Sequence, residues 1–578
     1  MSSPSPQNPH ALALASKAAM DRKDWAGADA VLRQRLAVTP LDPGLLFDLG
    51  LVAYRRNALN DAEGLLRKAA ELGAGEPALL LLGRIFSASR RDTDALRAYK
   101  AVLKSNPTQF EALMALGDLR HRNGDRTGAR ANYRQAVAVR PADPDAVIKY
   151  SNAVWDEGAP ETAVAMTLEI LGLTRDLPAR ARILQSALWQ VECWERIKRG
   201  QMPYHAAHLD ELFFTYAAPL LVDYEATYAA LVAAGDAAAR TGLGLAHFCR
   251  GDRQGAEALF EAAGPVIAGS ILEAARFSPA FHETLRGASD ASLVDSLPPV
   301  VTVRPPVPDT AGVLYLSCDA VYFTGFGLPL LCSLKANSPA TPVHLHVIDP
   351  APGTAEQMAA FCDTLGLRFG LTTEAPGLNA VPTQEARNYF HSVRFIRFHE
   401  HLRIYQCPLW MADVDAIVNR DLGTLFRTLE GRDAAMRIRP GRLEPQNQFN
   451  ACVIGATPGP RSAGYYRQIA AYIADFYRKK ALRWGIDQLA MYAVFADLQD
   501  QQSAPALTLL DVKAIDYDYL DDGFFWCSSG SRKFQQLQRA SAPGTVPPAE
   551  GAEARYVAAF EHHWRTAQTI AAGIGWKI

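Results

Sequence analysis

The first third of the chain carries small apolar residues at a fixed period. Five alanines recur every 33 or 34 residues, three glycines each lie 12 residues before one of them, and a leucine or tyrosine lies four residues after. Small residues let two antiparallel helices approach closely, and the larger residue one turn later fills the gap. Because one hairpin cannot cover its own apolar face, the pattern predicts stacked helical hairpins. The positions are Ala28, Ala62, Ala95, Ala129 and Ala163, with Gly50, Gly83 and Gly117, and Leu66, Tyr99 and Tyr133.

Prolines mark the end of the repeating unit. Pro40, Pro107 and Pro141 each follow one of the alanines by 12 residues. A proline there stops the second helix because it has no N–H to donate and clashes with the preceding turn. The unit of about 34 residues resembles the tetratricopeptide repeat. The resemblance implies an α-helical solenoid over residues 9–170.

Hairpins are expected to resume after this array. Residues 171–290 are helical in character, and Gly244 and Ala256 repeat the 12-residue offset, so we expect a tetratricopeptide-like hairpin near 240–263. In the repeat phase, the residue after each signature glycine faces the concave surface of the solenoid. These residues are Leu51, Arg84, Asp118 and, in the fourth repeat, Asn152.

The pattern changes between residues 291 and 310. Five prolines in this short span stiffen the chain and forbid helix, so we expect a linker there. Beyond it, apolar runs typical of buried strands alternate with helical patterns. The alternation predicts an α/β domain over 311–540, with a mostly parallel sheet covered on both faces, and a helical tail at 541–578.

An acidic pair lies where such a sheet holds its ligand. Asp413 and Asp415 come directly after the apolar run 408–412. Ligands bind at the carboxyl ends of parallel strands, and the two-residue period of an extended chain puts both carboxylates on one side. Two such groups can hold Mg²⁺ or Mn²⁺ against a diphosphate and offset the charge on a departing nucleoside diphosphate.

Four further pieces surround this pair in an order that resembles the GT-A-fold glycosyltransferases. The likeness is greatest to the retaining family that includes glycogenin and bacterial lipooligosaccharide galactosyltransferases, and it covers residues 311–535. The pieces are Asp319-Ala-Val-Tyr322, similar to the family's Asp-x-x-Tyr; Arg394 in the helix before the acidic pair; Phe449-Asn450-Ala451-Cys452-Val453, similar to Phe-Asn-(Ala/Ser)-Gly-Val; and Asp487-Gln488, similar to Asp-Gln.

The resemblance implies a role for each piece. The family's Asp and Tyr meet the nucleotide base, which places Asp319 and Tyr322 in a nucleotide pocket. Its basic residue before the metal motif binds the donor, which corresponds to Arg394. Its Asn contacts the sugar and its Asp-Gln lies at the sugar and acceptor. The matching residues here are Asn450, Asp487 and Gln488.

Each of these residues also has a purely structural interpretation. Tyr322 fits a core position, and Arg394 fits an ion pair with a helix neighbour such as Glu400. Asn450 fits a turn, and Asp487 fits the cap of a helix that begins near residue 486.

The C-terminal part of the family pattern is only partly present. The family carries His-x-x-Gly-x-x-Lys-Pro-Trp, whose His completes the metal site and whose Lys meets the diphosphate. Here Cys527 stands in the place of the His, Gly530 and Lys533 keep the spacing, and Pro-Trp is missing. A thiolate is a soft ligand, poor for Mg²⁺, so the metal has two aspartates or recruits another oxygen. Arg532 and Lys533 fit a clamp on the diphosphate.

Composition limits the other classes of function. The 578 residues are 49% hydrophobic and 21% charged, as in soluble globular proteins. Lys and Arg number 59 and Asp and Glu 61, so bulk charge favours neither nucleic acid nor an anionic membrane. Eight scattered cysteines are typical of a reducing compartment, and neither a secretory signal nor an apolar run of about 18 residues is found. We therefore expect a cytoplasmic protein without a membrane span.

Three functions fit this sequence. The first is an enzyme that transfers a sugar from a nucleotide-diphosphate donor to a protein held by the repeats, an architecture similar to that of protein O-glycosyltransferases, including those that modify bacterial flagellin. The second is a glycosyltransferase acting on a cell-envelope glycan, with the repeats as an assembly adaptor. The third is a non-catalytic scaffold whose transferase domain has decayed. The residue at Cys527 favours the third, and the acidic pair argues against it.

Overall fold

The computed structural model of the protein divides into two compact units, Met1–Trp194 and Glu195–Ile578. It describes residues 9–578 except 202–206, 296, 379–382, 440–441, 518, 529–532, 536 and 539–550. The first unit is helical, and the second combines helices with two β-sheets.

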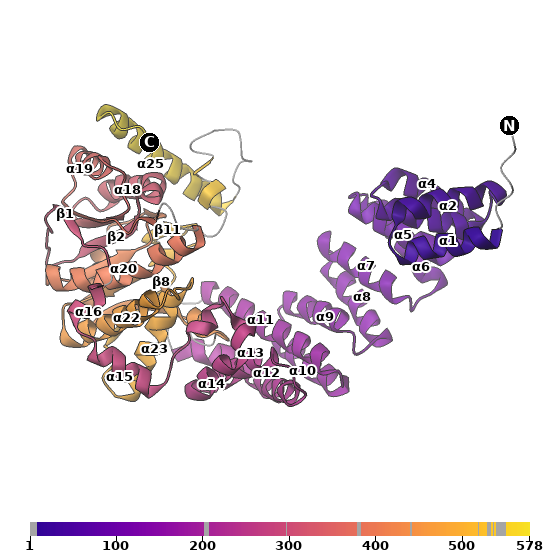
Figure 1. Ribbon diagram of the computed structural model, residues 1–578, viewed down its shortest axis with the longest axis horizontal. Helices are drawn as coiled ribbons and strands as arrows, with labels where there is room; N and C mark the ends of the chain where they lie inside the picture. Colours follow the sequence, from indigo (N-terminus) through magenta and orange to yellow (C-terminus); the bar gives the residue numbers. More distant parts are fainter. Residues whose placement is uncertain are drawn as a thin grey trace. The chain divides into compact units, whose positions relative to one another are not determined.

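The first unit is an array of antiparallel helical hairpins, in which α3 packs on α4, α5 on α6, α7 on α8 and α9 on α10 (Figure 1). Consecutive hairpins also pack on each other, as α4 does on α5. The helices are α1 (Pro9–Asp21), α2 (Trp25–Val38), α3 (Pro43–Arg55), α4 (Leu59–Ala69), α5 (Gly75–Ala88), α6 (Asp92–Ser105), α7 (Phe110–Arg122), α8 (Arg126–Val139), α9 (Pro144–Asp156), α10 (Pro160–Leu173) and α11 (Leu177–Gln201), which runs across the division between the units.

Three of the hairpins, α3–α4, α5–α6 and α7–α8, close on a glycine. A Cβ added at Gly83 would lie 2.4 Å from a ring carbon of Tyr99, and one at Gly117 would lie 2.4 Å from Tyr133. In these three hairpins the residue four positions after the phased alanine thus packs directly on the glycine of the partner helix. All five phased alanines are fully buried. The predicted repeat array is confirmed, together with the packing that explains its period.

The second unit carries an eight-stranded sheet of order β1-β4-β3-β2-β5-β8-β7-β9 and a three-stranded sheet of order β10-β11-β6. Strands of the large sheet are β1 (Val301–Arg304), β2 (Val313–Asp319), β3 (Val343–Ile348), β4 (Phe369–Glu374), β5 (Leu409–Ala412), β7 (Ala434–Ile438), β8 (Phe449–Ala456) and β9 (Leu507–Leu509); those of the small sheet are β6 (Ala416–Val418), β10 (Ile515–Asp516) and β11 (Phe525–Cys527).

The large sheet is mixed, where the sequence predicted a mostly parallel one. Strands β4, β3, β2 and β5 are parallel, but β8 is antiparallel to both β5 and β7, and β1 is antiparallel to β4. A fully buried apolar strand reads the same in either direction, so its orientation was not visible in the sequence. The parallel pairing of β2 and β5 brings their carboxyl ends to one edge of the sheet.

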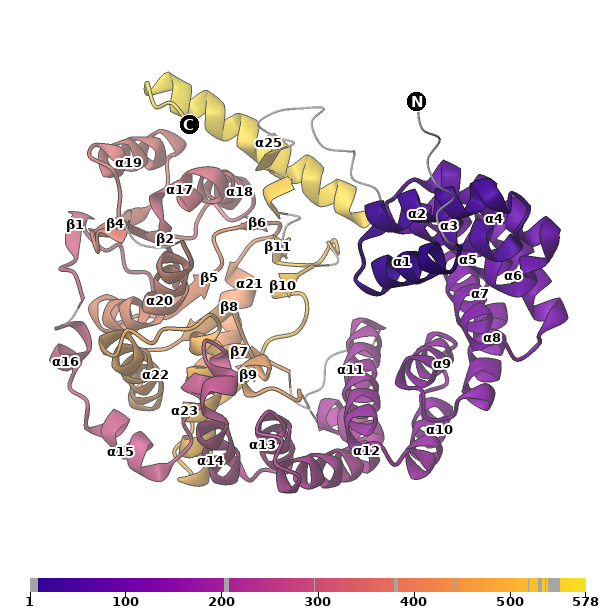
Figure 2. The same cartoon turned by 45° about the vertical axis from the view of Figure 1, so that its right-hand side comes forward.

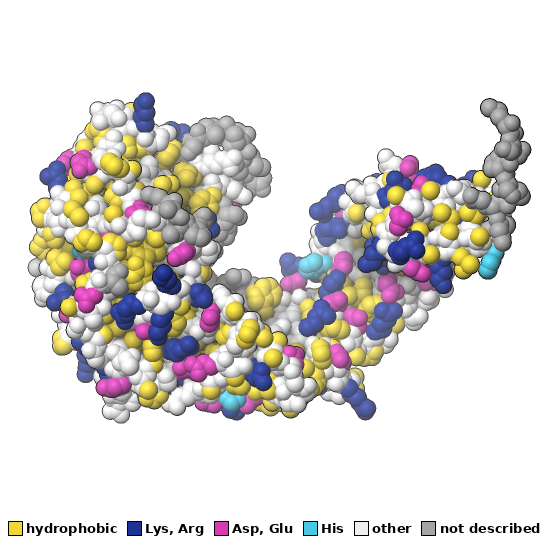
Figure 3. Space-filling view, in the orientation of Figure 1, with side chains coloured by type: hydrophobic (Ala, Val, Ile, Leu, Met, Phe, Trp, Pro, Cys, Tyr) yellow, Lys and Arg dark blue, Asp and Glu magenta, His cyan; other side chains and the backbone are white. Residues whose placement is uncertain are grey.

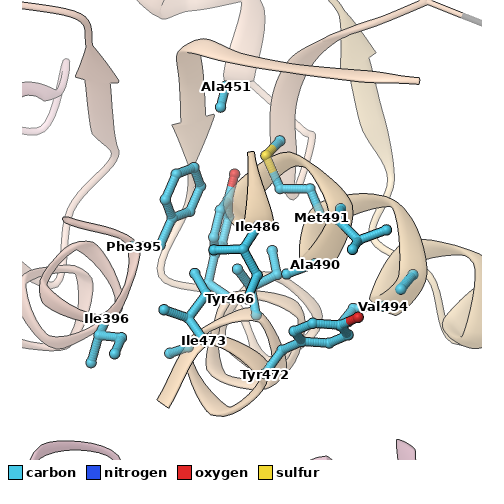
Figure 4. Close-up of a cluster of buried hydrophobic side chains, with 14 of the residues drawn as sticks. Phe395, Ile396, Ala451, Tyr466, Tyr472, Ile473, Ile486, Ala490, Met491 and Val494 are labelled. Carbon is cyan, nitrogen blue, oxygen red and sulfur yellow. The ribbon is translucent and has the colours of Figure 1, made fainter. Parts of the chain in front are cut away.

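Helices cover both faces of this sheet, because neighbouring residues of a strand point to opposite sides. Val313 and Tyr315 of β2 belong to one core, and Leu314 and Leu316 to the other. The first core is closed by α20, α22 and α23, and Figure 4 shows part of it, with Tyr466 and Met491 pointing toward one another. The second is closed by α18, α19 and α25; in Figure 2 α25 runs along α18.

The α-helices described in the second unit include those that close the two cores. They are α12 (Ala207–Ala233), α13 (Ala239–Cys249), α14 (Arg253–Ala263), α15 (Pro279–Gly287), α16 (Asp290–Val294), α17 (Ala320–Tyr322), α18 (Leu328–Asn337), α19 (Thr354–Leu365), α20 (Thr383–Tyr405), α21 (Gly423–Phe426), α22 (Pro460–Arg478), α23 (Ile486–Asp500) and α25 (Ala552–Gly573).

The segment expected as a linker at 291–310 is part of the α/β domain. Leu293 and Leu297 are buried in the first core, as is Phe260 of α14. Val301–Arg304 forms β1 at the edge of the large sheet. The prolines flank this strand and do not interrupt it, which an edge strand tolerates. The C-terminal helix, expected as a tail, also contributes to the second core of the domain.

Candidate functional site

The predicted site residues gather at the edge of the large sheet where β2 and β5 end. Asp319 is the last residue of β2 and Asp413 directly follows β5. The amide of Asp413 donates to the carbonyl of Cys452 on β8, 2.9 Å away. Since β8 runs antiparallel to β5, its first residues, including Asn450, lie at the same edge. Although the sheet is mixed, Asp319, Asp413 and Asn450 thus lie at the same edge of it.

Arg394 of α20 joins two of the predicted carboxylates. Its Nη1 donates to Asp413 Oδ1 at 2.6 Å, and its Nη2 lies 3.4 Å from Asp487 Oδ2. Burial alone would lower the pKa of Arg394, but the two carboxylates outweigh burial and raise it. The alternative partner, Glu400, pairs instead with Arg397 at 2.8 Å. Arg394 is therefore a buried cation inside the candidate site.

Asp415 is the centre of a second group. Lys533 Nζ lies 2.7 Å from Asp415 Oδ2, and the hydroxyl of Tyr322 donates to the same oxygen at 2.6 Å. Lys533 also donates to the Tyr322 hydroxyl at 2.8 Å. Burial and then Asp415 raise the pKa of Tyr322, so the phenol keeps its proton and remains a donor. Both aspartates of the pair are thus balanced by a basic side chain.

The other predicted residues have defined partners as well. Asp319 accepts from the amide of Tyr322 at 2.9 Å and caps α17, and burial raises its pKa. Asn450 Oδ1 accepts from the amide of Cys452 at 2.9 Å. Gln488 Oε1 accepts from Arg439 at 3.1 Å. Arg532 lies outside the described residues.

Asp487 is fully buried in the first turn of α23. Its Oδ1 lies 2.8 Å from His391 Nε2 and accepts from the amide of Gln488 at 2.9 Å. Burial raises the pKa of Asp487, but His391 and Arg394 outweigh burial and leave it below its usual value. The carboxylate is therefore ionised, and it is not a helix cap, because the N-cap of α23 is Gly485 and receives no side-chain hydrogen bond.

His391 and Trp484 are site residues that the sequence did not single out. The two rings stack with centroids 4.2 Å apart at 15°, and 58% of Trp484 is exposed. His391 precedes Arg394 by three residues, so both lie on one face of α20. This spacing was the available signal, but histidine on a helix face is too common to be informative alone.

The described side chains do not form a metal site by themselves. Cys527 Sγ lies 3.7 Å from Asp415 Oδ1, but burial, followed by Asp415 and Asp413, raises the pKa of this thiol well above its usual value. A protonated thiol is no ligand for a hard cation. Within the described ranges, no group of three His, Cys, Asp or Glu side chains is arranged to hold a metal. Mg²⁺ or Mn²⁺ here would have to displace Arg394 or Lys533 and take further oxygens from the donor.

The four predicted concave residues of the array differ in their surroundings. Asp118 is paired with Lys149 at 2.6 Å and accepts from Tyr133 at 2.8 Å. Arg84 is exposed, and Leu51 is half-buried. Asn152 is half-buried, and its Oδ1 has no hydrogen-bond partner in the part of the chain that the structure describes. Basic and acidic side chains are interspersed over the face of the array seen in Figure 3.

Comparison with known proteins identifies the first unit. A family model for the tetratricopeptide repeat matches residues 14–77, 80–146 and 120–176. Cellulose synthase operon protein C of Pseudomonas fluorescens (strain SBW25) is 28% identical over 159 residues, which is 26% of this chain and 12% of that protein. The match therefore spans about an eighth of the length of this relative. The N-terminal unit consists of tetratricopeptide repeats, which are typical of protein-interaction scaffolds.

Solved structures that are similar to part of this chain include the crystal structure of MamA protein, with 20% identity and a TM-score of 0.27 over 28% of this chain and 90% of that one. Another is a tetratricopeptide repeat protein from Parabacteroides merdae ATCC 43184, with 16% identity and a TM-score of 0.28 over 44% and 91%. Among the described residues, no helix has both the length and the apolar composition needed to cross a bilayer.

Proposed function

We propose that the protein is a glycosyltransferase that moves a sugar from a nucleotide-diphosphate donor to a protein held by the repeat array. The observation that carries the proposal is the clustering of the residues matched to the GT-A pattern. Asp413, Asp415, Arg394, Asp487 and Lys533 come from parts of the chain as much as 139 residues apart, yet direct side-chain contacts join them around the carboxyl ends of β2 and β5.

The basic residues of the cluster would bind the donor. Arg394 and Lys533 are held in place by Asp413 and Asp415, so their side chains are ordered before the donor arrives. Two fixed cations can neutralise the charge that grows on the diphosphate as the glycosidic bond to it breaks. Tyr322 and Asp319 would line the pocket of the nucleotide base, and Asp487, Asn450 and Gln488 the sugar.

A divalent cation would supply further charge neutralisation when bound with the donor. Asp413 and Asp415 are the residues that would hold Mg²⁺ or Mn²⁺, with donor oxygens completing the coordination. The ion pairs described above make this binding compete with Arg394 and Lys533.

The repeat array supplies the acceptor side of the proposal. Repeat solenoids present long surfaces to extended chains, and the exposed Arg84 could pair with an acidic side chain of the acceptor. A polypeptide such as flagellin is one candidate acceptor. The partial match to a cellulose synthase operon protein favours, as a second candidate, a cell-envelope glycan with the repeats as an adaptor.

The test is to incubate the full chain with UDP-, GDP-, ADP- and dTDP-sugars and to follow release of the nucleoside diphosphate. Adding lysate proteins or isolated envelope glycan and analysing both by mass spectrometry distinguishes the two acceptor classes. The enzyme proposal requires turnover of at least one donor. Absence of turnover with every donor, with and without acceptor, would support the scaffold alternative.

A further inference from the structure

Two arginines extend from the end of β7 beside the candidate site. Arg437 and Arg439 are two residues apart on an extended segment, so their side chains leave the same face of the sheet. A bulge between Met436 and Arg437 shifts the register and sets Arg437 opposite Asn450 of β8. The two arginines are thus adjacent to the residues proposed to contact the sugar.

Neither guanidinium is paired with a carboxylate in the described part of the chain. Arg439 Nη2 donates to the carbonyl of Phe449 and to Gln488 Oε1, both 3.1 Å away and both neutral. The Nε atoms of Arg437 and Arg439 are buried and have no acceptor among the described residues. Buried donors of charged groups are normally satisfied, so two such atoms side by side indicate a missing acceptor.

The charges around Arg439 also indicate a missing anion. Burial lowers its pKa, and the nearby Arg442 and Arg437 lower it further, while Cys452 opposes them. Arg394 and Lys533, by contrast, have raised pKa values because each is paired with aspartate. The uncompensated positive charge of the site therefore lies at the end of β7. Two like charges on partly buried side chains are unfavourable unless an anion joins them.

We infer that Arg437 and Arg439 form an anion subsite that takes a carboxylate or phosphate group of the substrate, next to Gln488 and Asn450. A planar guanidinium binds either group through two parallel hydrogen bonds. The phosphate would come from the donor's diphosphate, and the carboxylate from an acidic sugar. Anion binding here does not depend on the transfer reaction, so this inference goes beyond the proposed function and can hold if that function fails.

The experiment is calorimetric titration of the full chain, in EDTA, with sodium pyrophosphate, sodium glucuronate and glucose. Arg437→Gln is the main variant, because the side chain of Arg437 has no hydrogen-bond or ion-pair partner among the described residues whose loss would disturb folding, and Arg437→Lys keeps the charge. Arg439→Gln tests the second residue, and Arg461→Gln, on the exposed start of α22, is the control. Melting temperatures of all variants verify the fold.

The wild type should bind at least one of the two anions and not glucose. Arg437→Gln and Arg439→Gln should weaken that anion about tenfold, the loss of one charge-assisted interaction, while Arg437→Lys stays within about threefold of the wild type and Arg461→Gln does not change. Loss of pyrophosphate binding identifies the diphosphate as the source, and loss of glucuronate binding identifies an acidic sugar. If the wild type binds neither anion, or both glutamine variants bind as tightly as the wild type, the subsite does not exist.

Discussion

Lys533 Nζ lies 2.7 Å from Asp415 Oδ2 in the candidate site. The two residues are 118 positions apart, and the pair lies beside the ion pair of Arg394 with Asp413. A site that balances its own carboxylates with basic side chains is ordered without a ligand. A diphosphate could then exchange partners with these cations, and a divalent metal would have to compete with them. This relationship makes the metal requirement of the protein a measurable property.

Two variants of Tyr322 separate its hydroxyl from its ring. Tyr322→Phe removes the hydrogen bond to Asp415 but keeps the ring, so donor affinity should change little if the ring stacks on the base. Tyr322→Ala removes the ring and should weaken donor binding by roughly 1 kcal/mol or more. Calorimetry of both variants with the donor tests this. Equal affinity of the alanine variant and the wild type would remove Tyr322 from the nucleotide pocket.

The position of a truncation should decide whether the α/β domain folds. A chain starting near Pro308 lacks Leu293, Leu297 and Phe260, which are buried in the first core, so it should be unstable or aggregate. A chain starting at Ala207 keeps these residues and should melt cooperatively. It should release nucleoside diphosphate but lose transfer to the acceptor. Full transfer by the chain that starts at Ala207 would show that the repeats do not hold the acceptor.

A matched pair of glycines tests the packing of the array. A Cβ at Gly83 would lie 2.4 Å from Tyr99, so Gly83→Ala should destabilise the first unit by about 1–3 kcal/mol. Gly64, in the exposed part of α4, has nothing within 4 Å of an added Cβ, and Gly64→Ala should be neutral or stabilising by up to about 1 kcal/mol. Urea unfolding followed by circular dichroism measures both. Equal effects would contradict the close approach at Gly83.

Acid should destabilise the second unit through histidines buried without charge. Burial, followed by His346, lowers the pKa of His401 to about 3, and burial lowers that of His344 well below its usual value. Unfolding exposes both to water, where the pKa is about 6.5. Their contribution to stability is therefore complete above about pH 6.5 and is lost as the pH falls toward 3, by roughly 1.4 kcal/mol per pH unit for each histidine.

Melting temperatures between pH 7.5 and 5 measure this dependence. His344→Gln should reduce the slope, whereas His562→Gln, at an exposed position of α25, should not. A melting temperature that stays constant over this range would show that these histidines are not buried in their neutral form.

Local pattern was sufficient for most elements of the fold. The alternation of apolar runs with helical patterns beyond residue 310 predicted helices between the strands, and α18, Leu328–Asn337, is one of them. The sequence pattern did not predict the structure of the segment 291–310, because contacts with distant parts of the chain determine it. Leu293 is buried because α16 packs against α20 and α22, Leu297 is buried in the same core, and β1 forms because β4 offers a free edge. Proline content correctly excluded helix there but said nothing about an edge strand.

The candidate site was predictable as a set of residues but not as a set of contacts. Asp413 and Asp415 followed a recognisable strand, and Arg394 lay in the preceding helix. The ion pair of Lys533 with Asp415 joins distant segments, so no local pattern revealed it. Arg437 and Arg439 did leave a signal, two arginines spaced by two at the end of an apolar strand. Their lack of a carboxylate partner is visible only in three dimensions.

The decisive measurement is the donor binding and turnover of variants of the acidic pair, Asp413 and Asp415. Calorimetry for binding and an assay of nucleoside diphosphate release for turnover would compare the wild type with Asp413→Asn, Asp415→Asn and the double variant. The donors are UDP-, GDP-, ADP- and dTDP-sugars in Mn²⁺ and in EDTA, and Asp92→Asn on the array is the control. We expect the wild type to bind and hydrolyse at least one donor, and either asparagine variant to lose roughly a hundredfold or more in turnover while still folding. Binding of no donor by the wild type, or normal turnover by the double asparagine variant, would contradict it.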